Sequence, residues 1–107
     1  MFIALEGSIE AIRLLAPITD RIALRDPSLA DQLRRAASSV AQNLGEGRRR
    51  RGRDRAHHFR VAAGSAEEAA TCLRIAEAWG YLEAADYAAA FARLDRVLAL
   101  TWPLTGR

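Results

Sequence analysis

The sequence has 107 residues, of which 50% are hydrophobic and 7% aromatic, a composition that excludes a disordered tail and a collagen-like repeat. All 16 basic side chains are arginines, and with 13 acidic side chains they give a formal charge of +3. Cys72 is the single cysteine, which excludes a disulfide-stabilised secreted scaffold and a thiolate zinc cluster and fits a reducing cytosol. The length predicts one domain covering residues 1–107.

The first residues lack the features of an export signal. They include Glu6 and Glu10 but no basic residue before Arg13, whereas a secretion signal begins with positive charge. No uncharged run approaches the roughly 20 residues that a membrane-spanning helix needs. We therefore expect a soluble, cytoplasmic protein without a membrane partner.

The first predicted helix is amphipathic. Its apolar residues recur at steps of three and four, the spacing of one helix face: Leu5, Ile9, Ile12, Leu15, Ile18 and Ile22. Pro17 lies inside this pattern and removes one backbone donor. We expect a bend near Leu15 or Ala16, or a division of the helix.

The segment Asp26-Pro27-Ser28 predicts the start of a second helix. Asp26 can cap it with Pro27 in the first helical position, or Ser28 can cap it with Asp31 three residues later. An apolar stripe follows, made of Leu29, Leu33, Ala36, Ala37, Val40 and Leu44. Beside it runs a second row, here called the polar stripe, made of Gln32, Arg35, Ser39, Asn43 and Glu46.

An arginine-rich segment follows this helix, which Gly45 and Gly47 are predicted to end, with Gly47 in a left-handed cap. Nine arginines stand against Glu46 and Asp54 between positions 34 and 60, which gives +7, whereas the other seven basic and eleven acidic residues give −4. The nine are Arg34, Arg35, Arg48, Arg49, Arg50, Arg51, Arg53, Arg55 and Arg60. This asymmetry is typical of a polyanion-binding surface, and the alternative is a solvated charged turn.

The third predicted helix, from about Asp54 to Trp79 and ended by Gly80, has two apolar faces. One face suits a bundle core and consists of Phe59, Ala62, Ala63, Ala66, Ala70 and Leu73. The other is a candidate subunit contact, because a helix of a monomeric bundle needs only one such face. It consists of Val61, Ser65, Cys72, Ile75 and Trp79. Gly64 lies among small residues and predicts a close approach of another backbone.

The last predicted helix begins near Ala84 and is limited by Pro103. One face carries Tyr87, Phe91, Leu94, Leu98 and Thr101 or Trp102, with Ala90, Val97, Leu100 and Leu104 beside it. No stretch alternates with the period of two that strands require. The sequence therefore predicts an all-α protein, an up-and-down antiparallel four-helix bundle.

The sequence offers no catalytic constellation. A di-iron bundle needs two Glu-x-x-His pairs, whereas this chain has only Asp54 with His57, next to His58. We expect structural or phosphate-contacting roles for both histidines. Cys72 lies on a mostly apolar face without a nearby histidine, which is typical of an inert thiol. The prediction is a non-enzymatic protein without metal or cofactor.

The arginine-rich segment suits phosphate. Arginine presents a planar fork of donors that matches phosphate oxygens, and the start of the following helix adds a positive dipole end. No aromatic residue lies between Arg48 and His58, so base stacking is poorly supported and backbone or shape recognition is favoured. A membrane-surface role is disfavoured because Arg48 to His58 contains only Ala56 as an apolar residue.

Several motifs between about Ser28 and Leu82 occur together in one order. They are Gln32-Leu33-Arg34-Arg35-Ala36, Ser39, Asn43, Glu46-Gly47-Arg48, Phe59, Ala62, Gly64-Ser65, Glu67 or Glu68, and Trp79-Gly80-Tyr81-Leu82. In these residues the chain resembles the four-helix-bundle family of 23S ribosomal RNA intervening-sequence proteins. The same family includes Avd, the accessory variability protein of diversity-generating retroelements.

The resemblance implies an up-and-down bundle that assembles into a homopentameric barrel with a basic surface. It also implies that Arg34, Arg35 and Arg48 belong to the family motif, with which the polar stripe coincides. Members similar to Avd bind nucleic acid and a partner reverse transcriptase. For the polar stripe, hydrogen bonding within the bundle and hydrogen bonding between subunits both remain open.

The leading hypothesis is a non-enzymatic homo-oligomer, pentameric by resemblance, whose arginines bind RNA or DNA phosphates. The alternative is an interaction scaffold whose basic face docks a partner enzyme such as a reverse transcriptase. An enzyme ranks third, because no paired acid, nucleophile or metal arrangement is found.

Overall fold

The computed structural model describes residues 1–106, which form four α-helices and one short 3-10 helix. The helices are α1 (Ile3–Arg25), α2 (Pro27–Arg48), α3 (Gly52–Ala78) and α4 (Ala84–Thr101), and η1 (Trp102–Leu104) follows α4. No strand occurs in residues 1–106. The all-helical prediction is confirmed.

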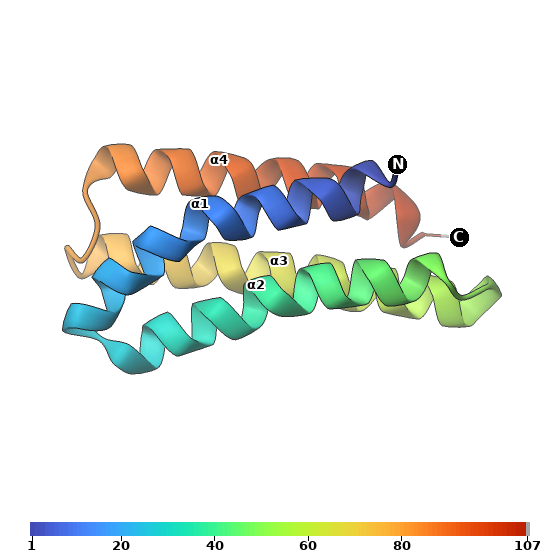
Figure 1. Ribbon diagram of the computed structural model, residues 1–107, viewed down its shortest axis with the longest axis horizontal. Coiled ribbons are helices and arrows are strands. Elements are labelled where there is room, and N and C mark those ends of the chain that lie inside the picture. The colour runs from blue at the N-terminus through green and yellow to red at the C-terminus, as the bar shows by residue number, and fades with distance from the viewer. Residues whose placement is uncertain (107) are drawn as a thin grey trace.

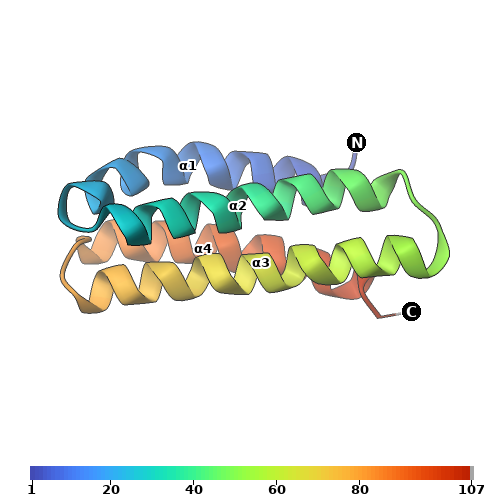
Figure 2. The ribbon, with the colours of Figure 1, turned by 90° about the horizontal axis from the view of Figure 1, so that it is seen from below.

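Successive helices run in opposite directions, as the ribbon in Figure 1 shows. Each helix packs against its neighbours in sequence, α1 also packs against α4, and the contact between α2 and α3 is the most extensive. The bundle measures 42 × 22 × 20 Å along its principal axes. Both chain ends lie toward the end where α2 joins α3, and that turn extends beyond them (Figures 1 and 2).

The core is built from a few large side chains and many alanines. Phe59, Ile22, Leu33, Leu44 and Leu73 are among the largest fully buried side chains. The buried face of α3 is rich in small residues, namely Ala56, Ala62, Ala63, Ala66, Ala69, Cys72 and Ala76. Small side chains let helix backbones approach closely, which is consistent with the extensive contact between α2 and α3.

Pro17 does not divide the first helix. The helix α1 is continuous from Ile3 to Arg25, and Pro17 lies exposed within it. In Figure 1 the ribbon of α1 changes direction in its second half, in line with the expected bend. The hydroxyl of Thr19 donates to the carbonyl of Ala16 at 2.8 Å in this region.

Two helix ends form as predicted. The backbone N–H of Leu29 donates to Asp26 Oδ1 at 3.0 Å, so Asp26 caps α2 and Pro27 takes the first helical position. At the end of α3, Gly80 has φ +79°, and the N–H of Tyr81 donates to the carbonyl of Ala76 at 2.8 Å. This six-to-one hydrogen bond with a left-handed glycine is a Schellman motif.

Two other glycine predictions are wrong. Gly47 is a buried helical residue in α2, which continues to Arg48, and the left-handed glycine of this region is Gly52 with φ +59°. A Cβ on Gly47 would lie 2.7 Å from Phe59 Cε1, so this glycine provides space rather than a backbone turn. Gly64 is exposed and a Cβ there would meet no atom within 4 Å. The tight contact at a glycine is therefore that of the Phe59 side chain with Gly47.

The second apolar face of α3 is only partly an outer surface. Cys72 is buried and belongs to the core, which corrects the prediction that it faces outward, whereas 39% of Ile75 and 69% of Trp79 is exposed. Val61 and Ser65 are half-buried. The exposed part of this face is therefore confined to the end of α3.

The buried face of α4 lies between the two predicted rows. The side chains buried in it are Ala90, Leu94, Val97 and Thr101. Tyr87, Phe91 and Leu98 are half-buried, and Trp102 is exposed. The predicted row of Tyr87, Phe91 and Leu98 therefore lies at the edge of the buried face, next to Ala90 and Val97.

Within residues 1–106 no helix is both long and apolar enough to span a membrane.

The contact at Gly47 leads to a stability prediction. Gly47→Ala adds a methyl group against the buried Phe59 ring, and overpacking of this kind costs about 1 to 3 kcal/mol. Gly45→Ala is the matched control, because a Cβ there meets no atom within 4 Å and the better helix propensity stabilises by up to about 1 kcal/mol. Urea denaturation followed by circular dichroism measures both. Equal or higher stability of Gly47→Ala would contradict the tight contact.

Candidate nucleic-acid interface

Seven of the nine predicted arginines gather where α2 joins α3. They are exposed and are here called the basic end: Arg48, Arg49, Arg50, Arg51, Arg53, Arg55 and Arg60. Arg48 is the last residue of α2, Arg51 directly precedes α3, and Arg60 lies further along α3. Arg60 Nη1 donates to the carbonyl of Thr105 at 3.3 Å, which ties α3 to the segment after η1.

The other two predicted arginines lie elsewhere. Arg34 and Arg35 are on the first half of α2, and at 1.5 Å per residue about 20 Å of helix separates them from Arg48. Both are exposed and paired, because Arg34 Nη2 donates to Asp20 Oδ1 at 3.0 Å and Arg35 Nη2 lies 3.3 Å from Asp31 Oδ2. The structure therefore does not bring them into the basic end.

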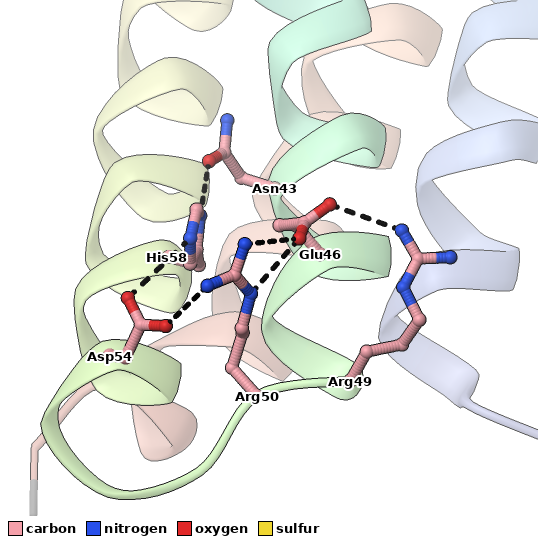
Figure 3. Close-up of polar contacts among 6 residues, drawn as sticks. All are labelled: Asn43, Glu46, Arg49, Arg50, Asp54 and His58. Atoms are coloured by element: carbon pink, nitrogen blue, oxygen red, sulfur yellow. Dashed lines mark hydrogen bonds and ion pairs between the residues drawn. The ribbon is translucent and has the colours of Figure 1, made fainter.

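Two carboxylates hold two of the arginines of the basic end (Figure 3). Arg49 Nη2 donates to Glu46 Oε1 at 3.1 Å, and Arg50 Nε and Nη2 donate to Glu46 Oε2 at 3.0 and 2.8 Å. Arg50 Nη1 donates to Asp54 Oδ2 at 2.8 Å. We call Glu46, Arg49, Arg50 and Asp54 the carboxylate clamp. It joins the last turn of α2 to the first turn of α3.

The clamp shifts the pKa values of Glu46 and Arg50. Hydrogen bonds from Arg50 and Arg49 lower the pKa of Glu46, and hydrogen bonds to Glu46 and Asp54 raise the pKa of Arg50. Because the pKa of Glu46 is lower in the folded than in the unfolded chain, its contribution to stability is complete above the ordinary value of 4.5. That contribution is lost as the pH falls through the lowered pKa.

A chain of polar contacts continues from the clamp along α2 and α3. Asp54 Oδ1 faces His58 Nε2 at 3.8 Å, and His58 Nδ1 lies 3.0 Å from Asn43 Oδ1. The Asn43 amide donates to the Ser39 carbonyl and hydroxyl at 2.9 and 3.2 Å, so its oxygen accepts and His58 Nδ1 carries a proton. The hydroxyls of Ser39 and Ser65 lie 2.7 Å apart. This chain bonds α2 to α3 within one protomer.

The polar stripe therefore divides into two parts. Ser39 and Asn43 take part in hydrogen bonds that reach α3, and Glu46 reaches Asp54 on α3 through Arg50. Gln32 and Arg35 are exposed, so they do not belong to this bonding. Hydrogen bonding within the bundle accounts for the inner part of the stripe.

Two further arginines of the basic end lie on aromatic rings. Arg48 Cζ is 5.8 Å from the centroid of the Phe2 ring, and Arg55 Cζ is 5.2 Å from that of Phe59. A guanidinium that rests on a ring uses its face, so the N–H donors along its edge remain available. Among residues 1–106, Arg51 and Arg53 have no ion pair or side-chain hydrogen bond.

The remaining candidates do not assemble a reactive centre within the part of the chain that the structure describes. His57 is exposed, with its ring 5.5 Å from that of His58. Burial, and to a smaller extent the charge of Glu68, raises the pKa of the Cys72 thiol, which keeps it protonated. Residues 1–106 contain no group of three or more His, Cys, Asp or Glu side chains placed to hold a metal ion.

Sequence reasoning missed the clamp and the ring contacts. Glu46, Arg50, Asp54 and His58 follow one another at intervals of four, which is a signal for contacts along a helix. The helix breaks between Arg48 and Gly52, however, so that spacing alone does not predict contact across the turn. The position of Phe2 beneath Arg48 depends on tertiary packing, for which the sequence carries no local signal.

The comparisons with known proteins agree with the fold. The sequence profile of the 23S rRNA-intervening sequence protein family matches residues 8–102. A protein of unknown function from the S23 ribosomal protein family of Bacteroides thetaiotaomicron VPI-5482, with a crystal structure at 1.70 Å, is similar with a TM-score of 0.86. It is 17% identical, over 97% of this chain and 99% of that chain, and at this identity it shows the fold alone.

No curated protein matches this chain. The family profile covers nearly the whole bundle, including the basic end and the polar stripe, and it agrees with the resemblance found in the sequence motifs. The chain therefore belongs to the 23S rRNA-intervening sequence protein family.

Proposed function

We propose that this protein is a non-enzymatic, homo-oligomeric nucleic-acid-binding protein whose basic end contacts the phosphate backbone of RNA or DNA. The observation that carries this proposal is the concentration of charge at one end of the bundle. Seven exposed arginines lie there with two carboxylates, Glu46 and Asp54, for a formal charge of +5. An excess of this size attracts polyanions and releases their condensed counterions.

The chemistry of the basic end favours phosphates over bases. Arginine forks bind phosphate oxygens with two parallel hydrogen bonds, and such contacts position a nucleic acid without reading its sequence. The aromatic rings of this region offer little stacking surface, because Phe59 is buried and Arg48 lies over Phe2. Without a stacking platform, the binding energy comes from the backbone.

An apolar surface at the end of α3 supports the proposed assembly. Ile75 and Trp79 are 39% and 69% exposed, and because they are four residues apart on α3 they form one apolar patch. A groove of about 270 Å³ lies between α1 and α2, with Ile12, Leu15 and Leu33 in its wall. A contact that joins two different surfaces of identical copies is heterologous, and it forms a ring where the rotation between copies closes. A ring fits the pentamer expected from the family.

The proposed nucleic-acid binding leads to a prediction. A variant with Arg48, Arg49, Arg50 and Arg51 replaced by glutamine loses affinity for duplex DNA and structured RNA. The slope of its log affinity against log salt concentration on duplex DNA becomes shallower by about 0.9 for each phosphate contact removed. Fluorescence anisotropy across a salt series measures both quantities.

The control removes four arginines away from the basic end, namely Arg13, Arg21, Arg25 and Arg74, and so changes the charge equally. It keeps the wild-type slope. If the wild-type protein does not bind, or binds without salt dependence, phosphate binding by the basic end is refuted. The basic end is then a docking site for a protein, such as a partner enzyme.

The proposed assembly leads to a further prediction. The double variant Ile75→Ser/Trp79→Ser sediments as a monomer, whereas the wild type sediments at a multiple of the 11.7 kDa chain mass, five being expected. Trp102→Ser is the control, because Trp102 is 48% exposed but lies on η1, away from the proposed contact. Analytical ultracentrifugation at micromolar concentration measures the masses. A monomeric wild type, or an oligomeric double variant, contradicts the proposed contact.

A further inference from the structure

We infer that the arginines of the basic end other than Arg60, which donates to the Thr105 carbonyl, have two different roles, and that their ligand is a double-helical nucleic acid. Arg48, Arg51, Arg53 and Arg55 contact phosphates. Arg49 and Arg50 instead hold the turn between α2 and α3. This inference rests on the proposed function and specifies which residues carry it and which form of nucleic acid they bind.

The carboxylate clamp neutralises its own arginines. Arg50 directs three of its five N–H donors to carboxylates, at distances of 2.8 to 3.0 Å, and Arg49 directs one to Glu46 at 3.1 Å. The two arginines and two carboxylates carry no net charge together. A phosphate that binds Arg50 has to displace a carboxylate already in contact, so it gains little and releases few counterions.

Arg48 and Arg55 are ordered by contacts that leave their donors accessible. Each guanidinium lies within 6 Å of a ring centroid, at 5.8 Å for Phe2 and 5.2 Å for Phe59. Phe59 is buried and fixed by the core, so the guanidinium above it is held in place before any ligand arrives. A pre-ordered donor loses less conformational entropy on binding.

Arg51 and Arg53 are the least engaged side chains of the basic end. They flank Gly52, whose φ of +59° sets the direction in which α3 begins. Both are exposed, and neither has an ion pair or side-chain hydrogen bond within residues 1–106. Their donors bind a phosphate without displacing another contact.

The arrangement of these four arginines favours a duplex. Arg48 comes from α2 and Arg53 and Arg55 from α3, and the axes of packed helices lie about 8 to 10 Å apart. Donors carried by two adjacent helices can therefore contact phosphates on both sides of a duplex groove, which is about 6 to 12 Å wide. A single strand offers one row of phosphates and depends on stacking, for which His57 is the one exposed ring between residues 46 and 60.

The test compares two double variants with the same charge change. Arg51→Gln/Arg53→Gln flattens the salt slope on duplex DNA by about 1.8, which corresponds to two lost phosphate contacts. Arg49→Gln/Arg50→Gln flattens the slope less, because neither arginine contacts a phosphate and only the unpaired Glu46 and Asp54 weaken neighbouring phosphate contacts. Arg34→Gln/Arg35→Gln, about 20 Å away along α2, is the control for charge alone and leaves the slope unchanged. Equal flattening in the first two variants overturns the division of roles.

A second variant tests the clamp even if Arg49→Gln/Arg50→Gln loosens the turn. Glu46→Gln releases Arg49 and part of the donors of Arg50, so the slope becomes steeper by about 0.9 for each released arginine that reaches a phosphate. Asp31→Asn, which releases Arg35 on the first half of α2, removes the same charge and leaves the slope unchanged. A wild-type slope in Glu46→Gln overturns the clamp.

The same assay with single-stranded oligonucleotides of equal length tests the ligand. Tighter binding of the duplex supports the inference, and equal or tighter binding of the single strand overturns the assignment of a double helix. A wild type without salt-dependent binding to either ligand refutes the proposed function itself. A wild type that binds, with the paired variants equally weakened, refutes only the division of roles.

Discussion

The close packing of α2 against α3, the most extensive helix contact of the bundle, brings the end of one helix next to the start of the other. Gly47 leaves a space that the Phe59 ring occupies, and the alanine-rich face of α3 lets the two backbones run close together. Because the helix ends are held near each other, three residues are enough to connect Arg48 to Gly52. The basic end is a consequence, since such a short connection gathers the arginines of both helix ends in one small region. The chain of polar contacts from Ser65 to Glu46 runs along the same contact and therefore depends on it too.

Seven like charges at one end of a small bundle repel one another, and neighbouring side chains reduce the electrostatic free energy of this repulsion. Glu46 and Asp54 cancel two of the charges and at the same time join the helices, because Arg50 bonds to both carboxylates. The rings of Phe2 and Phe59 attract the guanidinium groups of Arg48 and Arg55. The remaining charges are exposed to water and salt, which screen them. The folded state thus tolerates a positive end without neutralising it, which is the condition that phosphate binding requires.

Most of the fold could be predicted from the sequence, because helix boundaries depend on local chemistry. The capping of α2 by Asp26 and the end of α3 at Gly80 involve residues within a few positions of each other. The role of Gly47 could not be predicted, because a glycine near a helix end can supply either a left-handed turn or space, and only the position of Phe59 decides which. The candidate site was predicted as a set of arginines. Which of them are held by carboxylates depends on how the chain turns between Arg48 and Gly52, and helical spacing carries no information about that turn.

The division among the arginines also bears on how such a protein would select its ligand. Contacts to phosphates carry no sequence information, so under the proposed function one basic end would bind any duplex of suitable shape. Selectivity then has to come from geometry: from the rigid spacing of donors within one end and from the spacing between the ends of assembled copies. The clamp serves the first requirement, because it fixes the start of α3 relative to the end of α2. The proposed assembly would serve the second, because several weak ends held at fixed separations bind together only to a nucleic acid whose phosphates match those separations. The function of the bundle would therefore lie in the placement of charge, to which the helix contacts and the clamp both contribute.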